Sequence, residues 1–329
     1  MPVKLNRHNY KSKILGAAVG FGLVLALQPA FAQSEDYPSK PVNYIIVFNA
    51  GGASDIAARM QQKYFEEENG MPAVVQYMPG GGGAQGWSRL NNMEPDGYTI
   101  MGTNLPHNVL QPMAGDVGYE TEDITTVNFF QYTPNIIAVA ADSEFETLQQ
   151  LIDHAKENPG AVTFSGSGSR SGDEVMKARF DQISGVTTTY IPFSGTSPAS
   201  AALLGHQVTA SVTYTTEAVN QSDNIRVLAV AAEERLSSLP DAPTFKELGF
   251  DLVGGAYRGV GVPKDTPEEL RQAVSDAISR ISANAKFRSE MSEAGFVPID
   301  IPYSKVEAFI VDQKEIYQSV EEPLGLTSN

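Results

Sequence analysis

The stretch VNYIIVFNAGGASDIAARM, residues 42–60, decides the fold. The apolar and β-branched run Val42–Phe48 indicates a buried strand. The helical pattern that follows from Asp55 to Asn69 is closed by Gly70, a residue type that commonly ends helices. A strand that runs through two adjacent glycines into a helix is the first unit of an α/β fold. Its turn leaves the first N–H groups of the helix open to an anion.

This turn does not match the two common phosphate-binding loops. The pattern G-x-x-x-x-G-K-[ST] is absent because no lysine follows the glycines, and adjacent glycines do not make G-x-G-x-x-G. The stretch alone leaves open a plain turn in which Ser54 or Asp55 caps the helix.

The alternation of short strands and helices continues along the chain and predicts an α/β fold with largely parallel strands in two halves. Two Thr-x-x-Gln/Glu capping boxes mark helix starts, at Thr147 and at Thr266, the second with Pro267 at the first helical position. The last helices are expected to return to the first half. Strands are expected at Ala73–Gln76, Tyr98–Thr103, Asn135–Ala141, Val162–Phe164, Thr187–Ile191, Val208–Tyr214 and Arg226–Ala231.

Two later turns repeat the arrangement of strand, small residues and helix. One holds Ser165, Gly166, Ser167 and Ser169, and the other runs from Phe193 to Pro198. Hydrogen bonds to an ionised acceptor are roughly twice as strong as neutral ones. The three turns therefore predict a cage of N–H groups and hydroxyls that holds a carboxylate without an arginine.

The N-terminal segment reads as a cleavable export signal. Lys4, Arg7, Lys11 and Lys13 precede the apolar run Ile14–Leu27, and Ala30-Phe31-Ala32 gives an A-x-A cleavage pattern. Fourteen apolar residues fall short of the about 20 that span a bilayer. We expect cleavage after Ala32 and a periplasmic mature chain; an uncut membrane anchor is the alternative.

Charge and composition argue against several classes of function. Without the leader, 19 basic residues face 39 acidic ones, a net charge of about −20, which opposes nucleic acids and anionic membranes. The chain has no cysteine, so disulfides and thiolate chemistry are excluded. We expect no metal and no cofactor. An enzyme, for which Asp55 and His107 would be the candidates, is the alternative, but no catalytic motif is present.

Seven segments resemble, in order, those of the Bug/TctC proteins, which are periplasmic substrate-binding subunits of tripartite tricarboxylate transporters. They are YPSKPVNYIIVFNAGGASDIAARM, PGGGGAQGW, PDGYTIMG, HAKENPGAVTFSGSGS, YIPFSGTSPASAALLGHQV, IRVLAVAAEERLSSLPDAPTFKELGF and RGVGVPKDTPEEL. The resemblance implies a two-lobed periplasmic binding protein fold of the type II, Venus flytrap kind, each lobe a mostly parallel sheet flanked by helices. Lobe 1 would comprise residues 33–134 and 256–329, and lobe 2 residues 135–255.

The resemblance also implies a site. The loops Phe48–Asp55 and Phe193–Pro198 would grip one carboxylate, and Asn49, where the family usually has proline, would offer an extra amide. Tyr214 and Thr215 stand where the family usually has a Phe-Asp pair. The roles of Arg170, His107 and Arg258 stay open. The expected ligand-binding residues are Phe48, Asn49, Ala50, Gly51, Gly52, Ser54, Asp55, Ser165, Gly166, Ser167, Ser169, Ser194, Gly195, Thr196, Ser197, Tyr214 and Thr215.

The function expected from the resemblance is that of an extracytoplasmic receptor. It would bind a small mono-, di- or tricarboxylate between the lobes and deliver it to a two-subunit membrane permease. A receptor that presents its ligand to a sensor kinase is the alternative that sequence cannot separate from transport. We expect a monomer that binds no nucleic acid.

Overall fold

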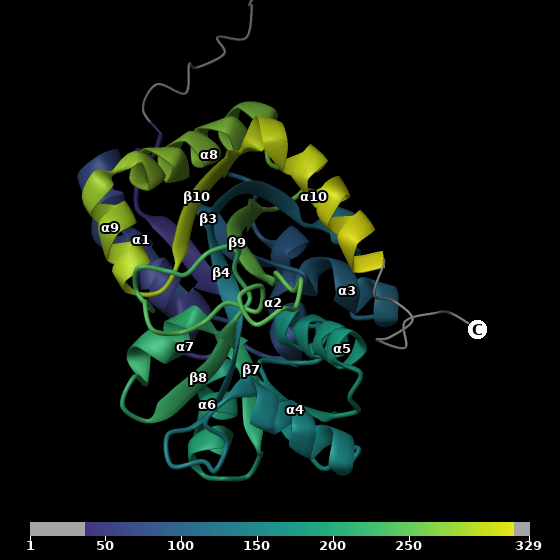
Figure 1. Cartoon of the computed structure of the whole chain (residues 1–329). Helices are drawn as coiled ribbons and strands as arrows, with labels where there is room; N and C mark the ends of the chain where they lie inside the picture. The colour runs from purple at the N-terminus through teal and green to yellow at the C-terminus, as the bar shows by residue number, and fades with distance from the viewer. Residues whose placement is uncertain (1–36, 319–329) are drawn as a thin grey trace, which may run out of the picture. The chain divides into compact units, whose positions relative to one another are not determined.

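The computed structural model describes residues 37–318, so the expected leader lies outside the described residues. A first sheet has the order β2-β1-β3-β9-β4-β10. Figure 1 shows β3, β9, β4 and β10 of this sheet. Its strands are β1 (Val42–Ile46), β2 (Ala73–Tyr77), β3 (Thr99–Leu105), β4 (Thr125–Ala140), β9 (Gly255–Val262) and β10 (Val297–Pro302).

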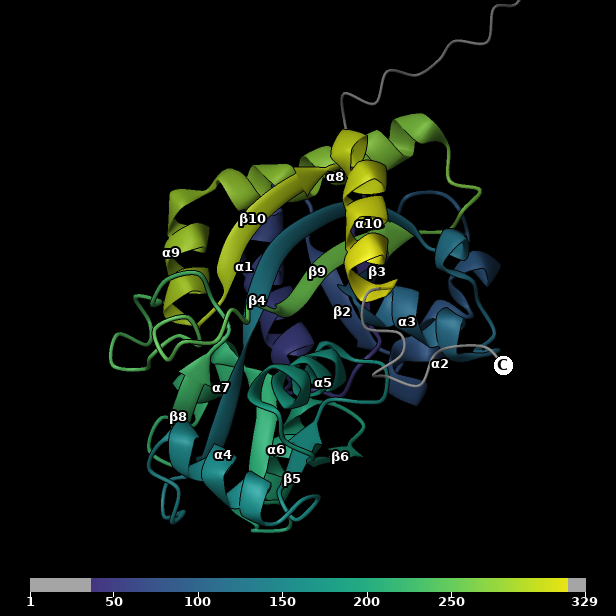
Figure 2. The same ribbon diagram turned by 45° about the vertical axis from the view of Figure 1, so that its right-hand side comes forward.

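The long strand β4 continues into a second sheet, of order β8-β4-β7-β5-β6. Figure 2 shows this strand curving from one sheet into the other. Its neighbours there are β5 (Thr163–Gly166), β6 (Thr189–Pro192), β7 (Ala210–Tyr214) and β8 (Ile225–Val230). β4 pairs with β9 up to Pro134 and with β7 from Asn135 onward. The lobe boundaries expected at 134/135 and 255/256 stay a prediction, which this change of partner supports.

The α/β fold class is confirmed, with one correction to the strand directions. The pairs among β1, β2 and β3 and those among β5, β6 and β7 are parallel, as expected. All pairs of β4 and β9 are antiparallel. One strand leaves the first sheet for the second and another returns, so these two must run in opposite directions.

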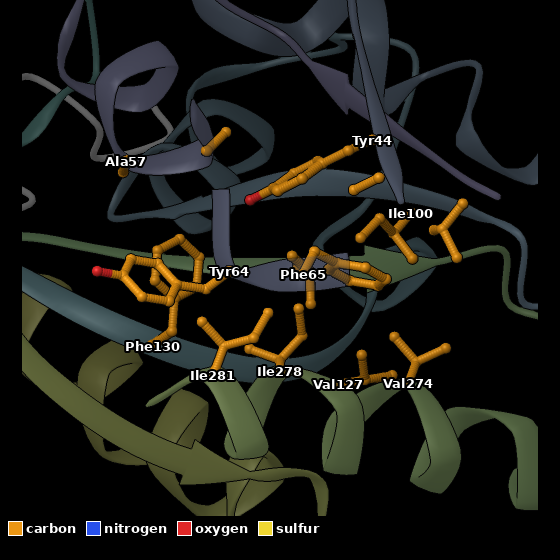
Figure 3. Close-up of a cluster of buried hydrophobic side chains, with 14 of the residues drawn as sticks. Tyr44, Ala57, Tyr64, Phe65, Ile100, Val127, Phe130, Val274, Ile278 and Ile281 are labelled. Carbon is orange, nitrogen blue, oxygen red and sulfur yellow. The ribbon is translucent and has the colours of Figure 1, made fainter. Parts of the chain in front are cut away.

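The first sheet is covered on both faces. Helices α1 (Ala53–Asn69), α8 (Glu268–Ala283) and α9 (Ala285–Glu293) cover one face, and α3 (His107–Ala114) and α10 (Tyr303–Gln318) the other. Figure 3 shows how apolar side chains of α1 and α8 meet those of β1, β3 and β4 in one core. The packing of α8 and α9 with α1 supports the expected return of the last helices to the first half, which stays a prediction.

The second sheet has its own cores, formed with α4 (Leu148–Glu157), α5 (Gly172–Ser184), α6 (Thr196–Leu204) and α7 (Thr215–Asn220). A short helix, α2 (Ala84–Trp87), and 3-10 turns at Gly81–Gly83, Leu90–Asn92 and Thr121–Asp123 complete the described elements. None of the helices within residues 37–318 has the length and apolar character that crossing a membrane requires.

Two of three expected helix ends are confirmed. Gly70 closes α1 in the left-handed conformation, with φ of +74°, and Thr147 begins α4 with a complete capping box. The box expected at Thr266 is wrong, because α8 starts at Glu268 with Pro267 as its N-cap and no side-chain cap bond. Thr266 precedes the N-cap by one residue. Its buried hydroxyl finds no hydrogen-bond partner among the described residues.

Candidate functional site

The loop between β1 and α1 presents unsatisfied backbone N–H groups. Its N-cap is Gly52, which has no side chain to accept a hydrogen bond from the first turn. Asp55 reaches back instead: Oδ2 accepts from the backbone N–H of Gly51 at 2.7 Å, and Oδ1 from the Tyr77 hydroxyl at 2.7 Å. The alternative in which Ser54 or Asp55 is the N-cap is therefore wrong. The Asp55 carboxylate instead fixes the shape of the loop.

A second helix N-terminus, that of α6, lies next to this loop. Its N-cap is Gly195, again without a side-chain cap bond. A Cβ placed on Gly51 would lie 3.5 Å from the Oγ of Ser197, so the two loops approach closely. The side-chain amide of Asn49 donates to the carbonyl oxygen and the hydroxyl of Ser194, both at 3.3 Å. The Asn49 amide thus joins the two loops.

A cavity lies where the two helix N-termini meet. Its empty volume is about 340 Å³, including open solvent. The lining comes from elements of both sheets and consists of Phe48, Asn49, Gly52, Ala53, Ser54, Asn104, His107, Ser167, Gly195, Thr196, Ser197, Tyr214 and Arg258.

Arg258, on β9, brings a full positive charge to this cavity. The residue is only 5% exposed. Its Nε donates to the Ser54 hydroxyl at 3.0 Å and its Nη1 to the Thr133 hydroxyl at 2.6 Å, and the guanidinium lies over the Tyr214 ring. Among residues 37–318 no carboxylate lies within ion-pair distance of it. Burial lowers the pKa of Arg258, although nearby Tyr214 and Asp173 oppose this.

Three other lining residues have buried polar atoms that find no hydrogen-bond partner among the described residues. They are the hydroxyls of Ser167 and Tyr214 and both ring nitrogens of His107. Burial, followed by the charge of Arg258, lowers the pKa of His107 to about 3, so the imidazole is neutral at neutral pH. Native proteins rarely leave buried polar atoms unpaired. These atoms therefore indicate that the cavity suits a polar ligand.

Asp173 supports the cavity from behind its wall. The carboxylate is fully buried; it accepts from the Ser167 backbone N–H at 2.7 Å and from the Asn135 side-chain amide at 2.8 Å. Burial raises its pKa to about 6, and the hydrogen bond from Ser167 and the charge of Arg258 counteract part of the rise. Asp173 does not line the cavity, and its two hydrogen bonds tie the loop after β5 to the point where β4 enters the second sheet.

The structure brings about half of the expected ligand-binding residues together. Phe48, Asn49, Gly52, Ser54, Ser167, Gly195, Thr196, Ser197 and Tyr214 line the cavity. The others do not line it: Ala50, Gly51, Asp55, Ser165, Gly166, Ser169, Ser194 and Thr215. For example, the Ser165 hydroxyl is hydrogen-bonded to the Ala199 carbonyl and the Ser211 hydroxyl, and the Thr215 hydroxyl donates to the Gly295 carbonyl. Contact of any of these residues with a ligand stays a prediction.

Sequence reasoning did not assign four lining residues: Ala53, Asn104, His107 and Arg258. Arg258 carried a usable signal, because a lone charge within the otherwise uncharged strand Gly255–Val262 is expensive to bury without a purpose. His107 carried less, since its role depends on Phe48, whose ring lies against the imidazole at 5.4 Å between centroids. Within the described residues, no cluster of three or more His, Asp or Glu side chains could hold a metal ion.

Two α/β sheets joined by crossing strands, with a small polar cavity between a helix N-terminus of each, define the class of solute-binding proteins with the periplasmic binding protein fold. The chain belongs to the TctC family, because residues 57–326 match the model of the tripartite tricarboxylate transporter family receptor. This is a family of receptors and not of enzymes, which removes the alternative built on Asp55 and His107.

Individual relatives agree with this assignment. A Cupriavidus necator protein, described as the "UPF0065 protein in gbd 5'region", is 28% identical and matches 98% of this chain and 99% of its own. The structure of the periplasmic binding protein BugD is 25% identical, with a TM-score of 0.81 over 89% of this chain and 100% of its own. An R. palustris protein with adipate has the same fold: TM-score 0.83, 22% identity, 88% of this chain and 99% of its own.

Proposed function

We propose that the protein is an extracytoplasmic receptor for a small carboxylate, which it delivers to a two-subunit membrane permease of the tripartite tricarboxylate type. The observation that carries the proposal is the meeting of the α1 and α6 N-termini at a cavity lined by polar side chains. Each helix N-terminus bears a partial positive charge of about half an elementary charge and free N–H donors. Both groups favour a carboxylate, and the adipate in the R. palustris relative is a carboxylate.

A screen of small carboxylates by thermal shift tests this proposal. The probes are acetate, malate, adipate and citrate, with the corresponding amides as controls. A ligand at about 100 times its dissociation constant adds about 2.7 kcal/mol of stability, which corresponds to a rise of about 4 °C for a protein of this size. We expect at least one carboxylate, and none of the amides, to raise the melting temperature. No rise with any carboxylate would contradict the proposal.

We further propose that the chain is exported and cleaved after Ala32, on the basis of the basic, apolar and A-x-A segments at its start. N-terminal sequencing of the protein recovered from the periplasm should begin at Gln33. A sequence that begins at Met1 would contradict the cleavage.

A further inference from the structure

Arg258 is a buried cation whose protein partners do not neutralise it. Its Nε and Nη1 donate to two uncharged hydroxyls, those of Ser54 and Thr133, and its Nη2 has no hydrogen-bond partner among the described residues. It is also the only charged side chain of the cavity lining, because burial keeps His107 neutral. Placing an ion in the interior without a partner costs several kcal/mol.

The surroundings of Arg258 increase this cost. Ser54, which accepts from its Nε, lies in the first turn of α1, where the helix dipole is positive. The N-terminus of α6, with Thr196 and Ser197, adds a second positive end to the same cavity. The nearest buried carboxylate, that of Asp173, lies beyond ion-pair distance and accepts from Ser167 and Asn135. A cation and two positive helix ends thus converge on one small space.

The hydroxyl of Ser54 shows where an anion would sit. Its oxygen accepts from Arg258 Nε at 3.0 Å and from the side-chain amide of Asn104 at 3.3 Å. With its acceptor capacity used in this way, the hydroxyl's own proton is left to donate. Ser54 and Arg258 both line the cavity, so their free donors border the same space as the N–H groups of α1.

We propose that Arg258 forms the ion pair with the carboxylate of the ligand, and that Ser54 and the first turn of α1 complete the donors around it. The proposal rests on the proposed function and deepens it. The sequence predicts a cage of N–H groups and hydroxyls without an arginine. The proposal adds the buried Arg258 to this cage. It also restricts the ligand to anions, because an uncharged analogue would leave the guanidinium buried and unpaired.

The test compares Arg258→Met, which removes the charge at similar length, with Arg258→Lys, which keeps it. Affinity is measured by calorimetry with the carboxylate, of the four screened, that raises the wild-type melting temperature most. Truncating one partner of a buried charge pair commonly costs 100-fold or more. We expect a loss of about 100-fold in Arg258→Met and a smaller loss, on the order of tenfold, in Arg258→Lys.

Arg226→Met is the matched control. Arg226 also donates only to uncharged oxygens, the carbonyls of Ala141, Ser143 and Phe145, and it does not line the cavity. Affinity in this variant should stay within about threefold of wild type.

The ligand-free melting temperature separates ligand pairing from a purely structural role. Arg258→Met should melt no lower than wild type, since an uncompensated buried charge is removed. Wild-type affinity in Arg258→Met, or a lower ligand-free melting temperature with unchanged affinity, would overturn the role of Arg258 and leave the proposed function intact. Absence of carboxylate binding to the wild type would overturn both.

Discussion

Gly51 and Gly52 allow the two loops of the site to approach each other. Gly51 has φ of +80°, a conformation that side chains disfavour. Gly52 has an ordinary extended backbone, so its lack of a side chain matters for space. A Cβ at Gly52 would meet the Asn49 carbonyl at 3.6 Å and the Ser197 and Thr196 side chains at 3.9 Å. These are ordinary contacts, and only larger groups would enter the cavity.

Gly52→Val should abolish ligand binding and leave the protein folded. The two added methyl groups would lie between the N-termini of α1 and α6, in the space proposed for the carboxylate. The matched control is Gly52→Ala, whose single Cβ fits at the distances above. We expect both ligand-free melting temperatures to stay within about 3 °C of wild type, because no core contact is lost.

Thermal unfolding and calorimetry on the two variants check this. If Gly52→Val unfolds, or binds the carboxylate as tightly as Gly52→Ala does, the loop is only a turn between a strand and a helix.

The buried carboxylate of Asp173 accepts a hydrogen bond from the loop after β5, and its burial favours the protonated form. Asp173, in the first turn of α5, has its pKa raised from 3.8 to about 6, mainly by burial. The folded state therefore holds this proton more tightly than the unfolded state does. Through Asp173 the wild type should lose up to about 3 kcal/mol of stability as the pH rises from about 4 to about 6, and no more above that.

Asp173→Asn should remove this loss. Urea unfolding at a series of pH values should show the free energy of unfolding of the variant gaining on wild type between pH about 4 and 6. The free energies of unfolding of variant and wild type must be subtracted at each pH, because His107 gives the stability of both proteins a pH dependence of the opposite sign. Its lowered pKa costs stability as the pH falls below about 6.5. This contribution is common to both proteins and cancels.

The exposed Asp153 on α4 provides the control for this experiment. Asp153→Asn makes the same substitution at an exposed position, and the gain of Asp173→Asn over wild type between pH about 4 and 6 should exceed any change that it shows. Equal pH dependence of Asp173→Asn and wild type would show that Asp173 is not the group that titrates there.

Local signals in the sequence were enough to place most elements but not all of their pairings. The glycine that closes α1 and the capping box of α4 are decided within one turn of chain, so both are confirmed. The box at Thr266 failed because Pro267 shifted the helix start by one residue. The first half of β4 was missed, since Thr125–Pro134 owes its strand conformation to β9 and β10, which lie far away in the sequence.

The turns of the candidate site could be predicted from the sequence. The residues that distant parts of the chain bring to the same cavity could not. Glycine and hydroxyl residues after each strand identified the two N-termini that meet at the cavity. Nothing local to Arg258 shows that β9 returns beside β3 and carries the guanidinium under the first turn of α1. His107 likewise enters the site through tertiary packing, with its ring beside those of Phe48 and Trp87.

For the molecule as a whole, we expect a strongly acidic protein to bind an anion through local positive charge. The chain carries a net charge of −16, which repels anionic ligands at long range. One guanidinium and two helix ends would outweigh this repulsion, because they would act on the ligand at short distance inside a buried cavity, where screening is weak. Raising the ionic strength screens the distant surface charges much more than the buried contacts.

Calorimetric titration of the wild-type protein with a carboxylate from the screen and with its amide, near neutral pH, tests this claim most directly. We predict that the amide binds at least about tenfold more weakly, a difference of about 1.4 kcal/mol or more, because it cannot pair with Arg258. Equal affinities for the acid and the amide would contradict it.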